Sequence, residues 1–86
     1  MKLYIIEDDQ SIIDAIKVAL EFRLPEAEVS AAITGKKGIS IIRQDAPDIV
    51  ILDLNLPDLS GFDVLQEIRK FSQVPVIILT VRSDDT

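Results

Sequence analysis

The residues of this sequence best suited to chemistry are carboxylates that directly follow apolar segments. Asp53 follows the apolar segment 49–52, and the acidic run Glu7-Asp8-Asp9 follows the segment 2–6. Carboxylates a few ångströms apart raise one another's pKa unless a cation offsets their repulsion. Because the chain has no cysteine and no histidine, it offers mainly hard oxygen ligands, which favour Mg²⁺.

A simpler role is also open for the acidic run. Aspartate is favoured just before the first turn of a helix, where it accepts hydrogen bonds from free amides. On its own, the run fits helix capping and cation binding equally well. Thr80, which follows the apolar segment 76–79, could donate a hydrogen bond to a phosphoryl oxygen, although a β-branched residue at a strand end is also ordinary. The occurrence of polar residues at three successive strand ends favours a functional interpretation.

The elements that would position these residues alternate between strand and helix. Strands are predicted at 2–6, 26–32, 49–52 and 76–79, and helices at 10–23, 35–44 and 62–71. The last two strands are continuous apolar runs, as expected of strands that are buried on both faces. Short connections imply right-handed crossovers and a parallel sheet, in the order 2-1-3-4 if the first strand pairs with the third. The predicted fold is therefore α/β, a doubly wound sheet with its chemistry at the carboxyl edge.

The second and third helices carry specific expectations. Thr34 is the expected N-cap of the second helix, which Gly35 and Gly38 weaken by roughly 1 kcal/mol for each interior glycine relative to alanine. The third helix is expected to direct apolar side chains inward, namely Phe62, Leu65 and Ile68, with Val64 as a further candidate.

Composition limits the class of protein. A chain of 86 residues with 48% hydrophobic and 28% charged residues is at most one small globular domain. Its net charge of -6 argues against direct binding of nucleic acid or of an anionic membrane. The first apolar segment is too short for a signal peptide and no run reaches membrane-spanning length, so a cytoplasmic location is expected. The absence of a GxGxxG fingerprint and of a P-loop disfavours nucleotide binding.

Three segments of the sequence resemble the receiver domain of two-component response regulators. They are Ile-Ile-Glu-Asp-Asp at 5–9, Ile-Leu-Asp-Leu-Asn-Leu-Pro-Asp-Leu-Ser-Gly at 51–61, and Pro-Val-Ile-Ile-Leu-Thr at 75–80. The resemblance covers all 86 residues and implies a flavodoxin-like (CheY-like) fold. It further implies that residues 1–86 are a single, C-terminally incomplete receiver domain, truncated after the fourth strand.

The resemblance implies roles in phosphoryl transfer for four residues. Asp53 would be the phosphoacceptor, Glu7 and Asp8 the acidic pair, and Thr80 the switch hydroxyl. The implied donor is the phosphohistidine of a histidine kinase or of a phosphotransfer protein. The domain would then catalyse at most its own phosphorylation.

The resemblance also implies a cofactor, Mg²⁺. Its ligands would be Asp8, Asp53 and the backbone carbonyl of Asn55, while Pro57 and Gly61 would shape the loop that follows Asp53.

Other functions stay open at this stage. The family continues through a fourth helix, a fifth strand with a lysine that contacts the phosphoryl group, and a fifth helix, and these are not among the 86 residues. The chain is therefore expected to be a fragment with impaired phosphoryl-transfer chemistry. Segment 76–79 would then be a sheet edge, so self-association through that edge or by swapping of elements is expected. One alternative is an interaction module or an engineered self-associating half-domain that accepts no phosphoryl group. Another is a haloacid-dehalogenase-like phosphatase, which needs a second Asp two residues after the nucleophile, where Asn55 stands.

Overall fold

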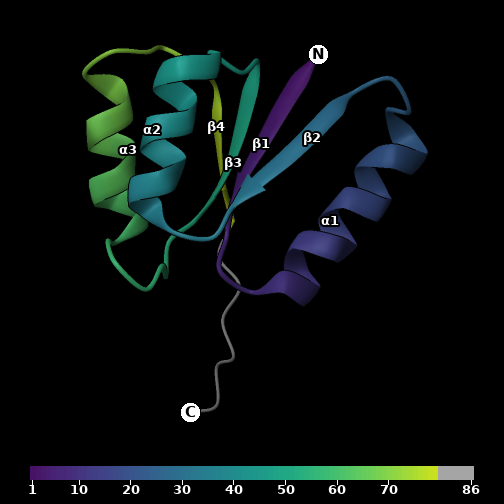
Figure 1. The fold of residues 1–86 in the computed structure, drawn as a ribbon, viewed down its shortest axis with the longest axis horizontal. Coiled ribbons are helices and arrows are strands. Elements are labelled where there is room, and N and C mark those ends of the chain that lie inside the picture. Colours follow the sequence, from purple (N-terminus) through teal and green to yellow (C-terminus); the bar gives the residue numbers. More distant parts are fainter. Residues whose placement is uncertain (80–86) are drawn as a thin grey trace.

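The fold is a four-stranded parallel sheet with helices on both faces (Figure 1). The computed structural model describes residues 1–79. The elements along the chain are β1 (Lys2–Ile6), α1 (Gln10–Arg23), β2 (Glu28–Ala32), α2 (Gly35–Asp45), β3 (Ile49–Asp53), α3 (Gly61–Arg69) and β4 (Val76–Leu79). The strands pair in parallel in the order β2-β1-β3-β4. The predicted α/β class and the predicted strand order are confirmed.

The two central strands, β1 and β3, hold the centre of the core. Their side chains Ile5, Ile6, Val50 and Leu52 are 0% exposed, which explains why the segments are apolar without alternation. Helices α2 and α3 lie on one face of the sheet and α1 on the other (Figure 1). The main core lies under α2 and α3 and comprises Ile6, Ile42, Val50, Leu52, Val64, Ile68 and Val74. None of the helices within residues 1–79 has both the length and the apolarity needed to cross a bilayer.

Two expectations about burial were wrong. Phe62 is 63% exposed, whereas Val64 is fully buried. Helix α3 begins at Gly61 after its N-cap Ser60, so its inward positions are 61, 64 and 68, and residue 62 falls on the outer side. Strand β4 is also less buried than its continuous apolarity predicts, with exposed Ile77 (55%) and Ile78 (38%). Because adjacent residues of a strand point to opposite faces of the sheet, Ile77 and Ile78 expose apolar surface on both faces of β4.

Helix α2 packs closely against β1 and α3 at its glycines. A Cβ atom on Gly38 would lie 2.5 Å from Cδ1 and 2.8 Å from Cγ1 of Ile6, a side chain with no exposed surface. A Cβ on Gly35 would lie 2.7 Å from Cγ2 of Val64 on α3. The residues that lower the intrinsic stability of the helix are therefore the ones that let it pack against β1 and α3.

Replacing Gly38 with alanine tests this packing. The gain in helix propensity is about 1 kcal/mol, but overpacking of a buried site costs about 1–3 kcal/mol. We expect Gly38→Ala to lower the free energy of unfolding, measured by urea denaturation followed by far-UV circular dichroism. Ser40→Ala, at an exposed position of the same helix, is the matched control and should not lower it. A Gly38→Ala variant as stable as Ser40→Ala would contradict the close approach.

Candidate functional site

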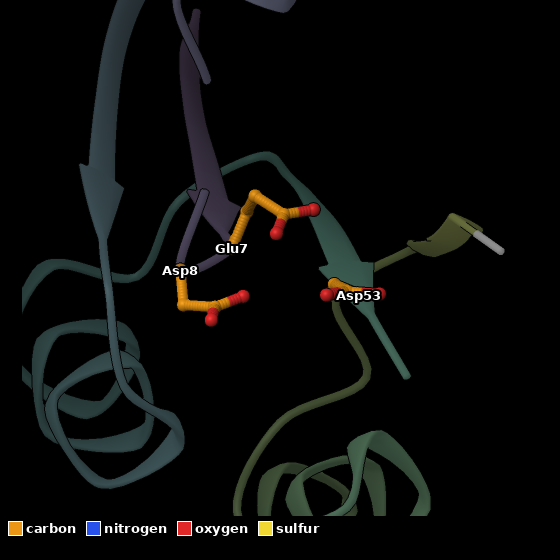
Figure 2. A group of neighbouring side chains, drawn as sticks. All are labelled: Glu7, Asp8 and Asp53. Carbon is orange, nitrogen blue, oxygen red and sulfur yellow. The ribbon is translucent and has the colours of Figure 1, made fainter. Parts of the chain in front are cut away.

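Three carboxylates meet at the carboxyl edge of the sheet. Glu7 and Asp8 follow β1, and Asp53 is the last residue of β3. These strands pair with Ile6 opposite Leu52, so their carboxyl ends lie side by side. One carboxylate oxygen from each of the three residues lies within 4.8 Å of the other two. Figure 2 shows Glu7 and Asp8 at the end of β1, on the side that faces Asp53.

Two of the three carboxylates are buried. Glu7 is 2% exposed and Asp53 is 5% exposed, whereas Asp8 is exposed. Oε2 of Glu7 accepts a hydrogen bond from the Asp9 N–H (3.1 Å), and Oδ1 of Asp53 accepts one from the Asn55 N–H (3.2 Å). Oε1 of Glu7 is buried and has no hydrogen-bond partner among the described residues. A buried carboxylate oxygen without a partner is strongly unfavourable, so a group with positive charge or donor character would complete the site.

The pKa of Glu7 is raised in this environment. Burial raises the pKa of Glu7 to about 7, the charge of Asp53 adds to the rise, and the Asp9 N–H opposes it. A cation at the cluster would offset the repulsion and would give the unpartnered oxygen a partner, directly or through a bound water. An oxygen-only donor set that includes one or two carboxylates fits Mg²⁺.

The acidic run 7–9 divides between two roles. Asp9 is the N-cap of α1, and its Oδ1 accepts hydrogen bonds from the N–H (2.9 Å) and the hydroxyl (2.6 Å) of Ser11. These hydrogen bonds hold the pKa of Asp9 below its ordinary value. Among the described residues, only Glu7 and Asp8 join Asp53 in the cluster. Helix capping and the carboxylate cluster therefore both occur, on different residues.

The loop after Asp53 is closed at its base. Asn55 and Ser60 form an antiparallel bridge, and the Gly61 N–H donates to the Leu54 carbonyl (2.9 Å). A Cβ on Gly61 would lie 2.6 Å from the backbone oxygen of Asp53 and from Cα of Leu54. Because both of these are backbone atoms that cannot rotate away, helix α3 can start this close to the strand end only from a glycine.

A shallow hollow adjoins the cluster on the loop side. Its volume is about 420 Å³. Its lining consists of Asp8 and the loop residues Leu54, Asn55, Leu56, Pro57, Asp58, Leu59 and Ser60. The structure therefore brings Asp8, Asn55 and Pro57 around one space beside Asp53. Thr80 lies outside the described residues, so the role of its hydroxyl stays a prediction.

The sequence does not predict the contact that one residue of this loop, Asp58, makes with α2. Asp58 accepts hydrogen bonds from the backbone amides of Gly35 and Lys36 at the start of α2. Aspartate after proline is ordinary turn chemistry, which gives no reason to expect a contact with a helix that begins 23 residues earlier.

The fold and the site together define a class of protein. A doubly wound parallel sheet with a carboxylate cluster between β1 and β3, where the strand order reverses, is a flavodoxin-like (CheY-like) α/β domain. Residues 3–86 match the response regulator receiver domain, and the chain belongs to this family. The family match decides against the haloacid-dehalogenase alternative.

Several relatives are similar over nearly the whole chain. Transcriptional regulatory protein AfsQ1 of Streptomyces coelicolor is 42% identical over 85 residues, which cover 96% of this chain and 36% of the relative. Transcriptional regulatory protein KdpE of Mycobacterium tuberculosis is 39% identical over 82 residues, which cover 95% of this chain and 35% of the relative. The MaeR response regulator bound to beryllium trifluoride has a TM-score of 0.87 at 25% identity, covering 98% of this chain and 70% of that one. The chain thus spans about a third of the length of the curated relatives.

The pKa of Glu7 predicts a pH-dependent stability in the absence of divalent cations. The folded-state value of about 7 lies above the ordinary 4.5. The contribution of a carboxyl with a raised pKa is fully present below the unfolded value and is lost as the pH rises through the folded value. At about 1.4 kcal/mol per pKa unit, the free energy of unfolding should fall by up to roughly 3 kcal/mol across this window.

Glu7→Gln should remove this part of the pH dependence and raise stability at alkaline pH. The measurement is urea denaturation in EDTA at a series of pH values across this window, followed by far-UV circular dichroism. Glu21→Gln, which changes an exposed glutamate, should retain the wild-type slope. An unchanged slope in Glu7→Gln would show that burial of Glu7 does not govern the effect.

Proposed function

We propose that this chain is a phosphoacceptor receiver module of a two-component system, in which Asp53 accepts a phosphoryl group in a Mg²⁺-dependent reaction. The observation that carries the proposal is the convergence of Glu7, Asp8 and Asp53 within 4.8 Å, with a buried Glu7 oxygen that lacks a partner. Membership in the receiver family supports a phosphohistidine of a histidine kinase or phosphotransfer protein as the donor. We also propose a cytoplasmic location, with which the absence of cysteine is compatible.

Residues of the carboxylate cluster and of the adjoining hollow would hold the ion. Asp8 and Asp53 would contribute carboxylate oxygens, and Asn55 its backbone carbonyl. Glu7 would complete the acidic pair and is held in place by the Asp9 N–H. When bound, Mg²⁺ supplies positive charge that offsets the repulsion between the carboxylates and stabilises charge on the transferring group.

Asp53 is the proposed nucleophile. Its Oδ1 accepts the Asn55 N–H, which leaves Oδ2 as the oxygen proposed to attack phosphorus. In that step the new bond joins Oδ2 to phosphorus, the bond between phosphorus and the donor nitrogen breaks, and an aspartyl phosphate forms. The Thr80 hydroxyl is the proposed hydrogen-bond donor to the phosphoryl group. Gly61, and Pro57 at the exposed tip, are proposed to shape the loop, and the close backbone contacts of Gly61 support its part.

Phosphorylation by a small donor tests the proposal. Incubation with a phosphoramidate and Mg²⁺, followed by intact-mass spectrometry, should give a gain of one phosphoryl group that is lost in Asp53→Ala and without Mg²⁺. Asp63→Ala, an exposed aspartate in the first turn of α3, should retain the gain. Folding of each sample is checked by circular dichroism. A folded wild-type protein that gains no mass with Mg²⁺ present would overturn the proposed reaction.

A second candidate function, protein interaction by self-association, is favoured by β4. Among the described residues this strand pairs with β3 alone, and Ile77 and Ile78 are 55% and 38% exposed. An edge strand with exposed apolar side chains is prone to pair with another chain. We propose that copies of this chain associate through β4 or by exchanging elements there.

Light scattering coupled to size-exclusion chromatography tests the association. The mean mass of the wild-type protein should rise with concentration, and Ile77→Lys should shift it towards the monomer because charge on an edge opposes pairing. Val18→Lys, a change from an exposed apolar residue on α1, is the matched control and should not shift it. A wild-type protein that stays monomeric at every concentration would rule the association out.

A further inference from the structure

The N-terminus of α2 is capped partly by a residue from another segment. Oδ1 of Asp58, in the loop between β3 and α3, accepts the Gly35 N–H (2.8 Å), and its Oδ2 accepts the Lys36 N–H (3.0 Å). Within residues 1–79, the hydroxyl of the local N-cap, Thr34, accepts only the Lys37 N–H (3.2 Å). Asp58 therefore satisfies two amides at the start of the helix that the Thr34 side chain does not.

The loop that carries Asp58 also carries Asn55, whose carbonyl is a proposed ligand of the ion. The bridge between Asn55 and Ser60 and the hydrogen bond from Gly61 to Leu54 hold the two ends of this loop together. They do not attach its tip to the rest of the domain. The hydrogen bonds of Asp58 attach it to α2, beside the packing of Leu56 and Leu59 against the core. Asp58 also lines the same hollow as Asp8 and Asn55.

The helix that receives Asp58 is itself fixed relative to the cluster. Gly38 of α2 lies directly against Ile6, the last residue of β1 and the neighbour of Glu7. Asp58 thus connects the loop after β3 to the end of β1 through α2. The amides of Lys36 and Gly35 lower the pKa of Asp58, so its carboxylate is charged at neutral pH and both hydrogen bonds are charge-assisted.

We propose that Asp58 is a positioning residue of the metal site, an inference that rests on the proposed function. By tying the loop 54–60 to α2, it would keep the Asn55 carbonyl beside Asp8 and Asp53, where the three could hold one Mg²⁺ ion. It acts through the loop and does not touch the ion. A cap with a purely structural role would stabilise α2 and leave the affinity for Mg²⁺ unchanged.

Three variants separate the two roles. Asp58→Ala removes both hydrogen bonds, and Asp58→Asn keeps one acceptor oxygen while removing the charge. Thr34→Ala weakens the same helix end without touching the loop. The probe is Mg²⁺ alone, titrated by calorimetry and by amide chemical shifts of isotope-labelled protein, and thermal stability is recorded for each variant.

Asp58→Ala should weaken Mg²⁺ binding about tenfold, the lower end of the effect of residues that orient metal ligands. Asp58→Asn should fall between Asp58→Ala and the wild type. Thr34→Ala should lose thermal stability and keep the wild-type affinity. The amide signal of Asn55 should shift in both Asp58 variants before any ion is added, and not in Thr34→Ala.

Other outcomes overturn the positioning role. An unchanged affinity in Asp58→Ala, or an equal loss in Thr34→Ala, would leave Asp58 as a helix cap only. An equal loss in both Asp58 variants would assign the effect to charge. If Asp58→Ala does not fold, Asp58→Asn compared with Thr34→Ala decides the matter. A wild-type protein that binds Mg²⁺ but accepts no phosphoryl group would overturn the proposed function alone, whereas one that binds no Mg²⁺ would overturn the positioning role as well.

Discussion

The structure depends on the parallel pairing of β1 with β3. Ile6 lies opposite Leu52 in this pairing, and both side chains have no exposed surface. A slip of one residue would move each inward side chain to the other face of the sheet, and the contacts of Ile6 with α2 and of Leu52 with the main core oppose it. The same register sets Glu7 beside Asp53. The core and the candidate site are therefore fixed by one set of contacts.

Placing two nearly buried carboxylates at these strand ends opposes folding. Neither Glu7 nor Asp53 has a cationic side chain beside it among residues 1–79, and one Glu7 oxygen has no donor. The hydrophobic core beneath them has to offset this unfavourable term. A site that is electrostatically unfavourable when empty gains more from a cation, because binding relieves the repulsion as well as adding new contacts.

Helix α2 shows how local weakness serves the tertiary arrangement. Its glycines lower the intrinsic helix propensity, yet both sit where a side chain would collide with Ile6 or with Val64. The close approach also brings the helix N-terminus within reach of Asp58. Helix α2 is marginal by helix propensity, but its contacts with the sheet, with α3 and with the loop after β3 stabilise it.

Much of this protein could be predicted from the sequence, because its signals are local. Apolar runs, turn residues and caps gave the α/β class, the element positions to within two residues and the N-cap Thr34. Given the pairing of the first strand with the third, the strand order and the convergence of Glu7, Asp8 and Asp53 follow from general rules for parallel sheets, and the structure confirms both. The two predictions that were wrong concerned burial, which depends on neighbours distant in the sequence. The burial of Phe62 and of β4 is decided by what packs against them, and the same pattern of apolar residues fits a covered or an uncovered face.

Residue types alone left the division of the acidic run open, although the family resemblance implied the pair Glu7 and Asp8, and the contact of Asp58 with α2 was decided only by the tertiary structure. Three adjacent acidic residues carry the same charge, and only the direction of the chain after β1 sends Glu7 and Asp8 towards Asp53 and leaves Asp9 at the start of α1. Asp58 meets α2 because β3 lies beside β1 and α2 lies close above it. The sequence by itself determined which chemistry was available, since residue types and short spacings are local properties. The distances between carboxylates, their burial and the attachment of the loop required the fold, because these contacts join segments that only the sheet brings together.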